Sequence, residues 1–189
     1  MHLVDWIAGA DQSQEFRLLS RWFRQVCQIR ERFATCMPGD FDPLGSNETA
    51  SVGFLAAAAS RSGLLTLTDY VSIKRGWEAR APYRLGRCDL WVADPLRQLS
   101  LAFEFKQGLI GKGTRIAKIS KLLDQACSDA RRVDRLEADH RFGAMVIGFQ
   151  SRAQSGEYDE GLRQLSARTS YCCRICGGAA PVWIYLESV

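Results

Sequence analysis

The chain has 189 residues, of which 47% are hydrophobic and 24% are charged, and its formal net charge at pH 7 is +4. This length fits one domain with a full apolar core, and the composition excludes a largely disordered chain. The mild positive charge is compatible with a polyanionic partner or with an ordinary solvated surface.

Targeting signals and cysteine usage narrow the class of protein further. The N-terminus has no basic segment followed by a long apolar stretch, so we expect no signal peptide. The most apolar window, residues 52–59, is too short to span a bilayer, so no membrane association is expected. The seven cysteines are scattered, which favours reduced thiols in a cytoplasmic protein over a secreted disulfide framework.

The first half of the chain predicts two helices and a strand. Residues 14–35 carry apolar side chains at a helical period, and a loop containing Pro and Gly follows. Ser46 and Asn47 can cap a second, alanine-rich helix that ends near Arg61. Residues 64–73 are rich in β-forming side chains and predict the first strand.

The next segment predicts a hairpin followed by a crossover. Two hydrophobic runs, 85–93 and 99–106, lie on either side of an Asp-Pro turn. A glycine-rich connection leads to a predicted helix over 114–138, and the apolar run 142–149 predicts a strand buried on both faces. The strand 99–106, this helix and the strand 142–149 would form a parallel crossover.

The C-terminal part adds a helix over 158–167 and a strand over 180–186. The alternation of helices and strands along the chain predicts an α/β domain with a mixed central β-sheet flanked by helices.

Charged residues interrupt the predicted hairpin. Asp89 lies on its first strand, and Glu104 and Lys106 point to one face of the second because side chains alternate along a strand. Burying three charges in apolar strands is costly unless they pair or bind a metal. Oxygens of Asp89 and Glu104, with the carbonyl of Phe105, would suit Mg²⁺ or Mn²⁺, and Lys106 beside such a metal would position or deprotonate a water.

The same residues allow a purely structural interpretation. Asp89 and Glu104 could form ion pairs with Arg87 and Lys106 across an antiparallel pair of strands. The strand-like runs, the tight turn between them and the basic helix that follows favour the metal site.

This arrangement resembles the PD-(D/E)xK phosphodiesterase superfamily, which has the restriction-endonuclease-like fold. The resemblance covers about residues 46–150 and implies a core of a helix, a three-stranded meander, a second helix and a fourth strand. An N-terminal helical extension at about 12–36 would precede this core within a single nuclease domain over 1–189. Cys88 stands where the family motif often has a proline.

The resemblance also implies roles for individual residues. Asp89 matches the metal-binding Asp, Glu104 the second acidic position and Lys106 the lysine of the motif. Glu48, which opens the first core helix, matches an accessory acidic residue, although capping of the helix explains it equally well. Gln125 on the second core helix matches a polar position used near the site by several members.

A basic stretch follows the motif lysine. Lys112, Arg115, Lys118 and Lys121 lie in the glycine-rich loop and the first turns of the helix over 114–138, with Lys118, Lys121 and Gln125 on one face. A helix N-terminus favours phosphate, so this patch is our candidate for contact with a nucleic-acid backbone. A solvated helix face is the alternative, and Arg131 and Arg132 are expected to be solvated.

Two cysteines form a Cys-x-x-Cys pair at Cys173 and Cys176. A structural zinc needs four ligands, and no second pair with suitable spacing is found, so free thiols are favoured.

The sequence therefore predicts a Mg²⁺- or Mn²⁺-dependent nuclease that acts on DNA in preference to RNA. The N-terminal helix and the C-terminal segment could support a homodimer or a larger complex. One alternative is an inactive module of the same fold that binds nucleic acid or a protein partner in a defence or mobile-element system. Another is a small protein whose basic patch binds an acidic partner.

Overall fold

A computed structural model of the chain describes residues 4–37, 41–76, 82–151, 154–176, 178 and 180–189. Its elements are, in chain order, β1 (Val4–Ala8), α1 (Gln14–Cys36), α2 (Pro43–Ser46), α3 (Glu48–Arg61), β2 (Leu65–Arg75), β3 (Tyr83–Asp94), β4 (Leu99–Ile110), α4 (Ile116–Arg132), β5 (His140–Phe149), α5 (Gln154–Ser166), β6 (Tyr171–Ile175) and β7 (Val182–Ser188).

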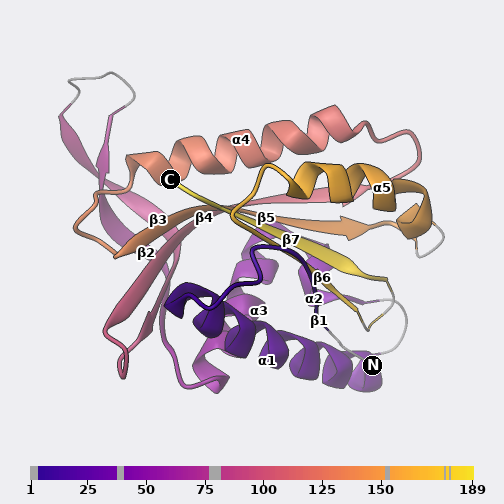
Figure 1. Cartoon of the computed structure of the whole chain (residues 1–189), viewed down its shortest axis with the longest axis horizontal. Helices are drawn as coiled ribbons and strands as arrows, with labels where there is room; N and C mark the ends of the chain where they lie inside the picture. Colours follow the sequence, from indigo (N-terminus) through magenta and orange to yellow (C-terminus); the bar gives the residue numbers. More distant parts are fainter. Residues whose placement is uncertain (1–3, 38–40, 77–81, 152–153, 177, 179) are drawn as a thin grey trace.

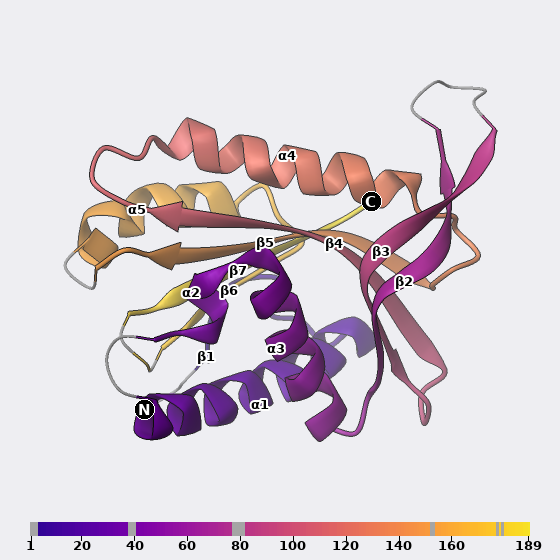
Figure 2. The ribbon, with the colours of Figure 1, turned by 180° about the vertical axis from the view of Figure 1, so that it is seen from behind.

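The strands form one seven-stranded sheet in the order β1-β6-β7-β5-β4-β3-β2. β4 and β5 run parallel, and the other neighbouring strands run antiparallel. Helices α4 and α5 cover one face of the sheet, and α1, α2 and α3 cover the other (Figures 1 and 2). The predicted α/β class, the mixed sheet and the N-terminal helix are therefore confirmed.

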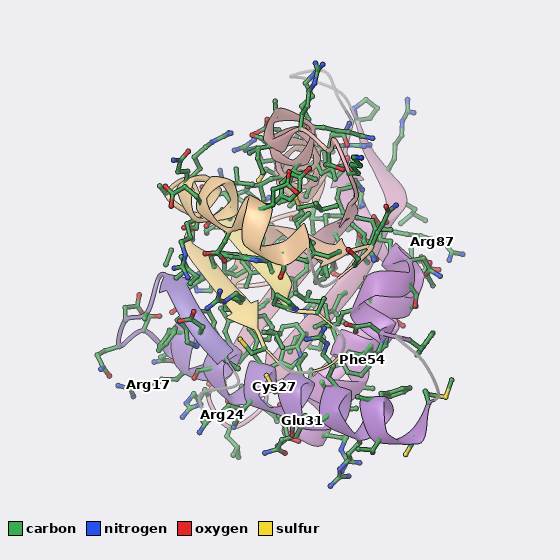
Figure 3. All side chains as sticks on the ribbon, turned by 90° about the vertical axis from the view of Figure 1, so that its right-hand side faces the viewer. Arg17, Arg24, Cys27, Glu31, Phe54 and Arg87 are labelled. Carbon is green, nitrogen blue, oxygen red and sulfur yellow. The ribbon has the colours of Figure 1, made fainter. Side chains whose placement is uncertain are left out.

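Each face of the sheet has its own apolar core. The larger one joins α1 and α3 to the sheet, and Trp22 lies within it, donating its indole N–H to the carbonyl of Leu55 over 2.8 Å. The second joins α4 and α5 to the other face. Figure 3 shows the charged side chains of α1, such as Arg17 and Arg24, on the outside of the molecule. The 3.6-residue period of α1 thus separates its buried and solvated faces.

Several predicted elements have different bounds in the structure. The strand expected to end at Lys106 continues to Ile110, because its parallel pairing with β5 extends to Phe149. Gly108 allows the sheet to pack closely there: an added Cβ would lie 2.6 Å from Cδ1 of Ile147. The helix expected over 114–138 ends at Arg132, where the chain returns to the sheet through a bridge between Val133 and Lys74. Residues 43–46, expected to be a loop, form a single helical turn, α2, capped by Asp42.

Strands β1 and β6 were not predicted at all. Each has five residues, and they pair with each other at one end of the sheet. Short strands without clear alternation carry little sequence signal, so their partners decide whether they form. No helix among the described residues is long and apolar enough to cross a membrane.

The β2–β3 hairpin diverges from the rest of the sheet. β3 pairs with β4 only from Leu90 to Asp94, whereas its pairing with β2 continues to Tyr83. Asp69, close to the start of this divergence, has a left-handed backbone with φ of 48°. The outer half of the hairpin projects past the end of α4 (Figure 1). One edge of β4 is consequently left without a strand partner beyond Phe103.

Candidate active site

Two carboxylates occupy the open edge of β4. The backbone N–H of Phe105 donates to Oδ2 of Asp89 over 2.7 Å, and the backbone N–H of Gln107 donates to the carboxyl group of Glu48. These donors would face β3 if the ladder continued, and buried N–H groups need a partner. Because the hairpin diverges here, the N–H groups on either side of Lys106 are satisfied by Asp89 from β3 and by Glu48 from the first turn of α3.

Glu104 is buried, with 4% of its surface exposed, and its partner is a residue that sequence reasoning missed. Nζ of Lys74, near the end of β2, lies 2.6 Å from Oε1 of Glu104. Gly86 allows this approach, because a Cβ there would lie 2.8 Å from Cδ of Lys74. The predicted strand stopped at residue 73, and only the twist of the hairpin brings Lys74 over β4.

Lys106 also has a partner that was not predicted. Its Nζ lies 3.1 Å from Oδ2 of Asp129 on α4. Burial lowers the pKa of Lys106, but the hydrogen bond and charge of Asp129, together with the charges of Glu48 and Asp89, raise it overall. Lys106 is therefore an ammonium group at neutral pH.

The structural interpretation of the sequence, in which Asp89 and Glu104 pair with Arg87 and Lys106, predicted the wrong ion-pair partners. Arg87 forms an ion pair with Asp69 on the surface of the hairpin, and Glu104 pairs with Lys74. Asp89 accepts a backbone hydrogen bond instead of pairing with Arg87. The charges at the divergence are thus held by contacts between elements distant in the sequence.

Six charged groups meet at this point, and their charges do not balance. We call them the carboxylate–lysine cluster: Glu48, Asp89, Glu104, Asp129, Lys74 and Lys106. If all six are ionised, four carboxylates face two ammonium groups, which leaves an excess of two negative charges.

The surroundings of the cluster raise the pKa of two of its carboxyl groups. Burial raises the pKa of Glu104; the hydrogen bond from Lys74 opposes this rise, and Asp89 and Asp129 add to it. Burial also raises the pKa of Glu48, with Lys106 opposing the rise and Asp89 adding to it. Both carboxylates would gain from a further positive charge nearby.

The cluster fits a divalent cation in its charge and its donor type. Carboxylate oxygens are the ligands that Mg²⁺ and Mn²⁺ prefer, and one such ion would offset the two excess negative charges. Among the described residues, however, no group of three or more His, Cys, Asp or Glu side chains is arranged to hold a metal ion. A metal at Glu104 would have to compete with Lys74 for that carboxylate.

The predicted nucleic-acid patch lies apart from this cluster. Its side chains are all exposed, on the loop before α4 and on the first half of that helix: Lys112, Arg115, Lys118, Lys121 and Gln125. Lys118 and Asp129 are separated by roughly 16 Å along the helix axis at 1.5 Å per residue. Gln125 lies one helical turn before Asp129, whereas the structure does not bring the basic side chains of the patch into the cluster.

The cysteines near the predicted motifs are buried thiols. Cys88 donates its Sγ proton to the carbonyl oxygen of Phe103 over 3.4 Å, and burial raises its pKa to about 12. Cys173 lies in β6 and is fully buried, and burial raises its pKa well above the usual range. Cys176 is a free thiol. In the described part of the chain, neither Cys176 nor Cys173 belongs to a group of side chains that could bind a metal ion.

Comparison of the chain with models of protein families, with curated proteins and with solved structures gives no match. The functional argument therefore depends on the geometry of the site itself.

Proposed function

We propose that this chain is a metal-dependent nuclease that hydrolyses phosphodiester bonds of DNA, with Mg²⁺ or Mn²⁺ as its cofactor. The observation that carries the proposal is the convergence of Glu48, Asp89, Glu104 and Lys106 where β3 leaves β4. A buried and a half-buried carboxyl group, both with raised pKa values, beside a lysine are typical of a catalytic site.

The connection of the elements supports a restriction-endonuclease-like core within residues 48–149. α3 precedes the antiparallel strands β2, β3 and β4, and α4 then crosses over to β5, which runs parallel to β4. This is the order that the resemblance to the PD-(D/E)xK superfamily implies. The charged residues of the motif lie on the strands that this fold would assign to them.

Under this proposal Asp89 and Glu104, with the carbonyl of Phe105, hold the metal. The bound metal would lower the pKa of a water and offset charge on a phosphate oxygen. Lys106 is charged at neutral pH, so its part is to orient that water and to stabilise the negative charge that develops on the phosphorane. Glu48 accepts the N–H of Gln107 and keeps a carboxylate beside Lys106.

One observation favours a second candidate function, an inactive module of this fold that binds nucleic acid or a protein partner. Lys74 already compensates Glu104 at 2.6 Å, and Lys106 is paired with Asp129. A cluster built only for structure would use such internal pairs. The two candidates differ in whether a divalent metal displaces Lys74 from Glu104.

Cleavage of supercoiled and linear DNA in Mn²⁺ tests the proposal, with RNA as a parallel substrate. We expect Asp89→Asn to reduce the cleavage rate by at least a hundredfold, since it removes a metal ligand. Asp69→Asn is the matched control, because it makes the same change on the exposed part of the neighbouring strand, and it should cleave at the wild-type rate. Wild-type protein that cleaves neither DNA nor RNA, or Asp89→Asn protein that cleaves normally, would refute the nuclease.

A further inference from the structure

A second charged region lies beside the carboxylate–lysine cluster, at the C-terminal end of α4. A cavity of about 690 Å³ is lined there by five arginines: Arg75, Arg131, Arg132, Arg135 and Arg141. We call it the arginine cavity. Asp134 and the terminal carboxylate of Val189 also line it, so the ionised groups leave an excess of three positive charges.

These arginines come from separate elements. Arg75 ends β2, Arg131 and Arg132 end α4, Arg135 follows in the connection, and Arg141 lies on β5. Basic residues in the last turn of a helix interact favourably with its dipole, which would explain Arg131 and Arg132 alone. The other three are brought to the same cavity by the fold, so the helix dipole does not account for the set.

Several of the guanidinium groups have no acidic partner. In the described ranges, no ion pair with an Asp or Glu side chain involves Arg75, Arg131 or Arg135. Arg141 donates to the main-chain oxygens of Val133 over 2.6 Å and Val189 over 3.1 Å, which fixes its side chain in place. Burial and the neighbouring charges of Arg135 and Arg75 lower the pKa of Arg141. Such crowding of like charges is unfavourable unless an anion binds.

The lining suits a phosphate in particular. Arginine presents a planar fork of N–H donors that matches phosphate oxygens, and it binds them in pairs. Tyr83 adds an aromatic ring at the same cavity: Nη2 of Arg75 donates to its hydroxyl over 2.9 Å, and Cζ of Arg75 lies 5.4 Å from its ring centroid. Aromatic rings beside arginines are platforms for bases of single-stranded nucleic acid.

The arginine cavity adjoins the candidate site through two elements. Arg75 directly follows Lys74 on β2, and Arg131 comes two residues after Asp129 on α4. The bridge between Lys74 and Val133, which lines the cavity, joins the two regions, although consecutive side chains on a strand point to opposite faces. A nucleic-acid strand that occupies both regions would pass from one face of the hairpin to the other. The predicted patch at Lys118 and Lys121 is about 15 to 20 Å further along α4 from Arg131.

We propose that the arginine cavity binds backbone phosphates of a nucleic-acid strand and holds that strand against the candidate site. The binding of the strand stands on the cavity alone, and the placement of its neighbouring phosphodiester rests on the proposed nuclease function. Arg131 and Arg132, which the sequence suggested were only solvated, become part of the binding surface.

Binding without metal tests this assignment. The probes are a fluorescein-labelled single-stranded oligodeoxynucleotide and its duplex, measured by anisotropy in EDTA over a range of salt concentrations. The variant Arg131→Gln/Arg135→Gln removes the charges of two exposed side chains. We expect its affinity to fall at least tenfold, and the slope of log affinity against log salt to drop by about 1.4 for the single strand and about 1.8 for the duplex.

A matched control removes the same charge from the opposite face of the sheet. Arg32→Gln/Arg61→Gln changes two exposed arginines on α1 and α3, and its affinity should stay within twofold of wild type. The variant Lys118→Gln/Lys121→Gln compares the patch predicted from the sequence. If that variant loses binding and Arg131→Gln/Arg135→Gln does not, the assignment is overturned.

The same measurements separate this inference from the nuclease proposal. Wild-type protein that binds through the cavity but cuts nothing in Mn²⁺ would uphold the cavity and refute the nuclease. Wild-type protein that cuts DNA while Arg131→Gln/Arg135→Gln binds as tightly would refute the cavity alone. Wild-type protein that binds neither probe, or that binds only inorganic phosphate, would also overturn the assignment.

Discussion

Buried charge is used in two different ways in this molecule. Arg30 on α1 is 1% exposed, and Glu104 on β4 is 4% exposed. Arg30 forms an ion pair with Asp42 and donates to the carbonyl oxygens of Ile175 and Ala180, so its charge and its donors are satisfied inside the protein. Glu104 is also paired, but it belongs to a cluster that retains an excess of two negative charges.

The difference separates structural charge from candidate functional charge. A buried pair with all its hydrogen bonds made needs nothing from outside, whereas a cluster that remains unbalanced is stabilised by a ligand of opposite charge. The carboxylate–lysine cluster and the arginine cavity are unbalanced in opposite directions. The first suits a divalent cation and the second suits phosphate, and the two lie next to each other.

The largest loss of stability should come from breaking the buried ion pair between Arg30 and Asp42. Arg30→Met leaves Asp42 and two main-chain carbonyls without their donor, and removal of one partner from a buried ion pair costs about 3 to 5 kcal/mol. We expect the free energy of unfolding, measured in urea, to fall by about 3 kcal/mol or more. Arg32→Met on the exposed side of the same helix is the control and should change it by less than about 0.5 kcal/mol. Equal stability of the two variants would show that the Arg30 network is not structural.

The carboxylate–lysine cluster should bind a divalent metal, and this binding should stabilise the folded protein. An ion that binds only the folded state at a hundred times its Kd stabilises the protein by about 2.7 kcal/mol. We expect Mg²⁺ or Mn²⁺ to raise the melting temperature of wild-type protein and to have little effect on Asp89→Asn, which lacks one carboxylate. Asp69→Asn should keep the full response. A wild-type melting temperature that does not change with either metal would favour the inactive module.

A smaller effect should appear in the pH dependence of stability. The pKa of Glu48 is raised in the folded protein by burial, with Asp89 adding to the shift. The folded state then binds more protons than the unfolded state above the ordinary pKa of 4.5, so stability from this group is present below pH 4.5 and is lost as pH rises through the folded pKa. Relative to wild type, Glu48→Gln should therefore become more stable as pH increases from about 4.5 toward neutrality in the absence of metal. Denaturant titrations at several pH values measure this difference. A constant offset between the two proteins would contradict the raised pKa.

The pattern of local elements could be predicted well from the sequence. Strong periodicity located α1 and α4, and the hydrophobic runs located β3, β4 and β5, because burial of one face or of both faces leaves a regular signal over ten or more residues. Capping residues and a high alanine content located α3. The alternation that puts Glu104 and Lys106 opposite Phe103 and Phe105 was also visible. Short strands at the sheet edge were missed, because pairing with distant strands forms them.

The partners within the candidate site were much harder to predict. Lys74 reaches Glu104 only because the hairpin twists away from β4 and Gly86 leaves space for its side chain. Asp129 reaches Lys106 from α4, across the face of the sheet. These contacts join residues far apart in the sequence, and no spacing rule connects them. The arginine cavity was missed for the same reason, since its five arginines come from four segments of the chain.

The smallest loss of stability is expected for an ion pair that is exposed to solvent. This prediction tests whether an ion pair must be buried to contribute strongly to the free energy of unfolding. Arg87 and Asp69 form an ion pair on the hairpin with 67% and 63% of their side chains exposed, and Figure 3 shows Arg87 at the surface. Solvent screens such a pair, and exposed ion pairs contribute about 1 kcal/mol or less. We expect Arg87→Gln to change the free energy of unfolding by less than about 1 kcal/mol and to leave the metal response intact. A loss as large as that of Arg30→Met would mean that the hairpin, rather than burial, determines the strength of its ion pairs. The response of Arg87→Gln to Mn²⁺ separates the two regions, because a change in metal affinity would extend the carboxylate–lysine cluster outward along β3.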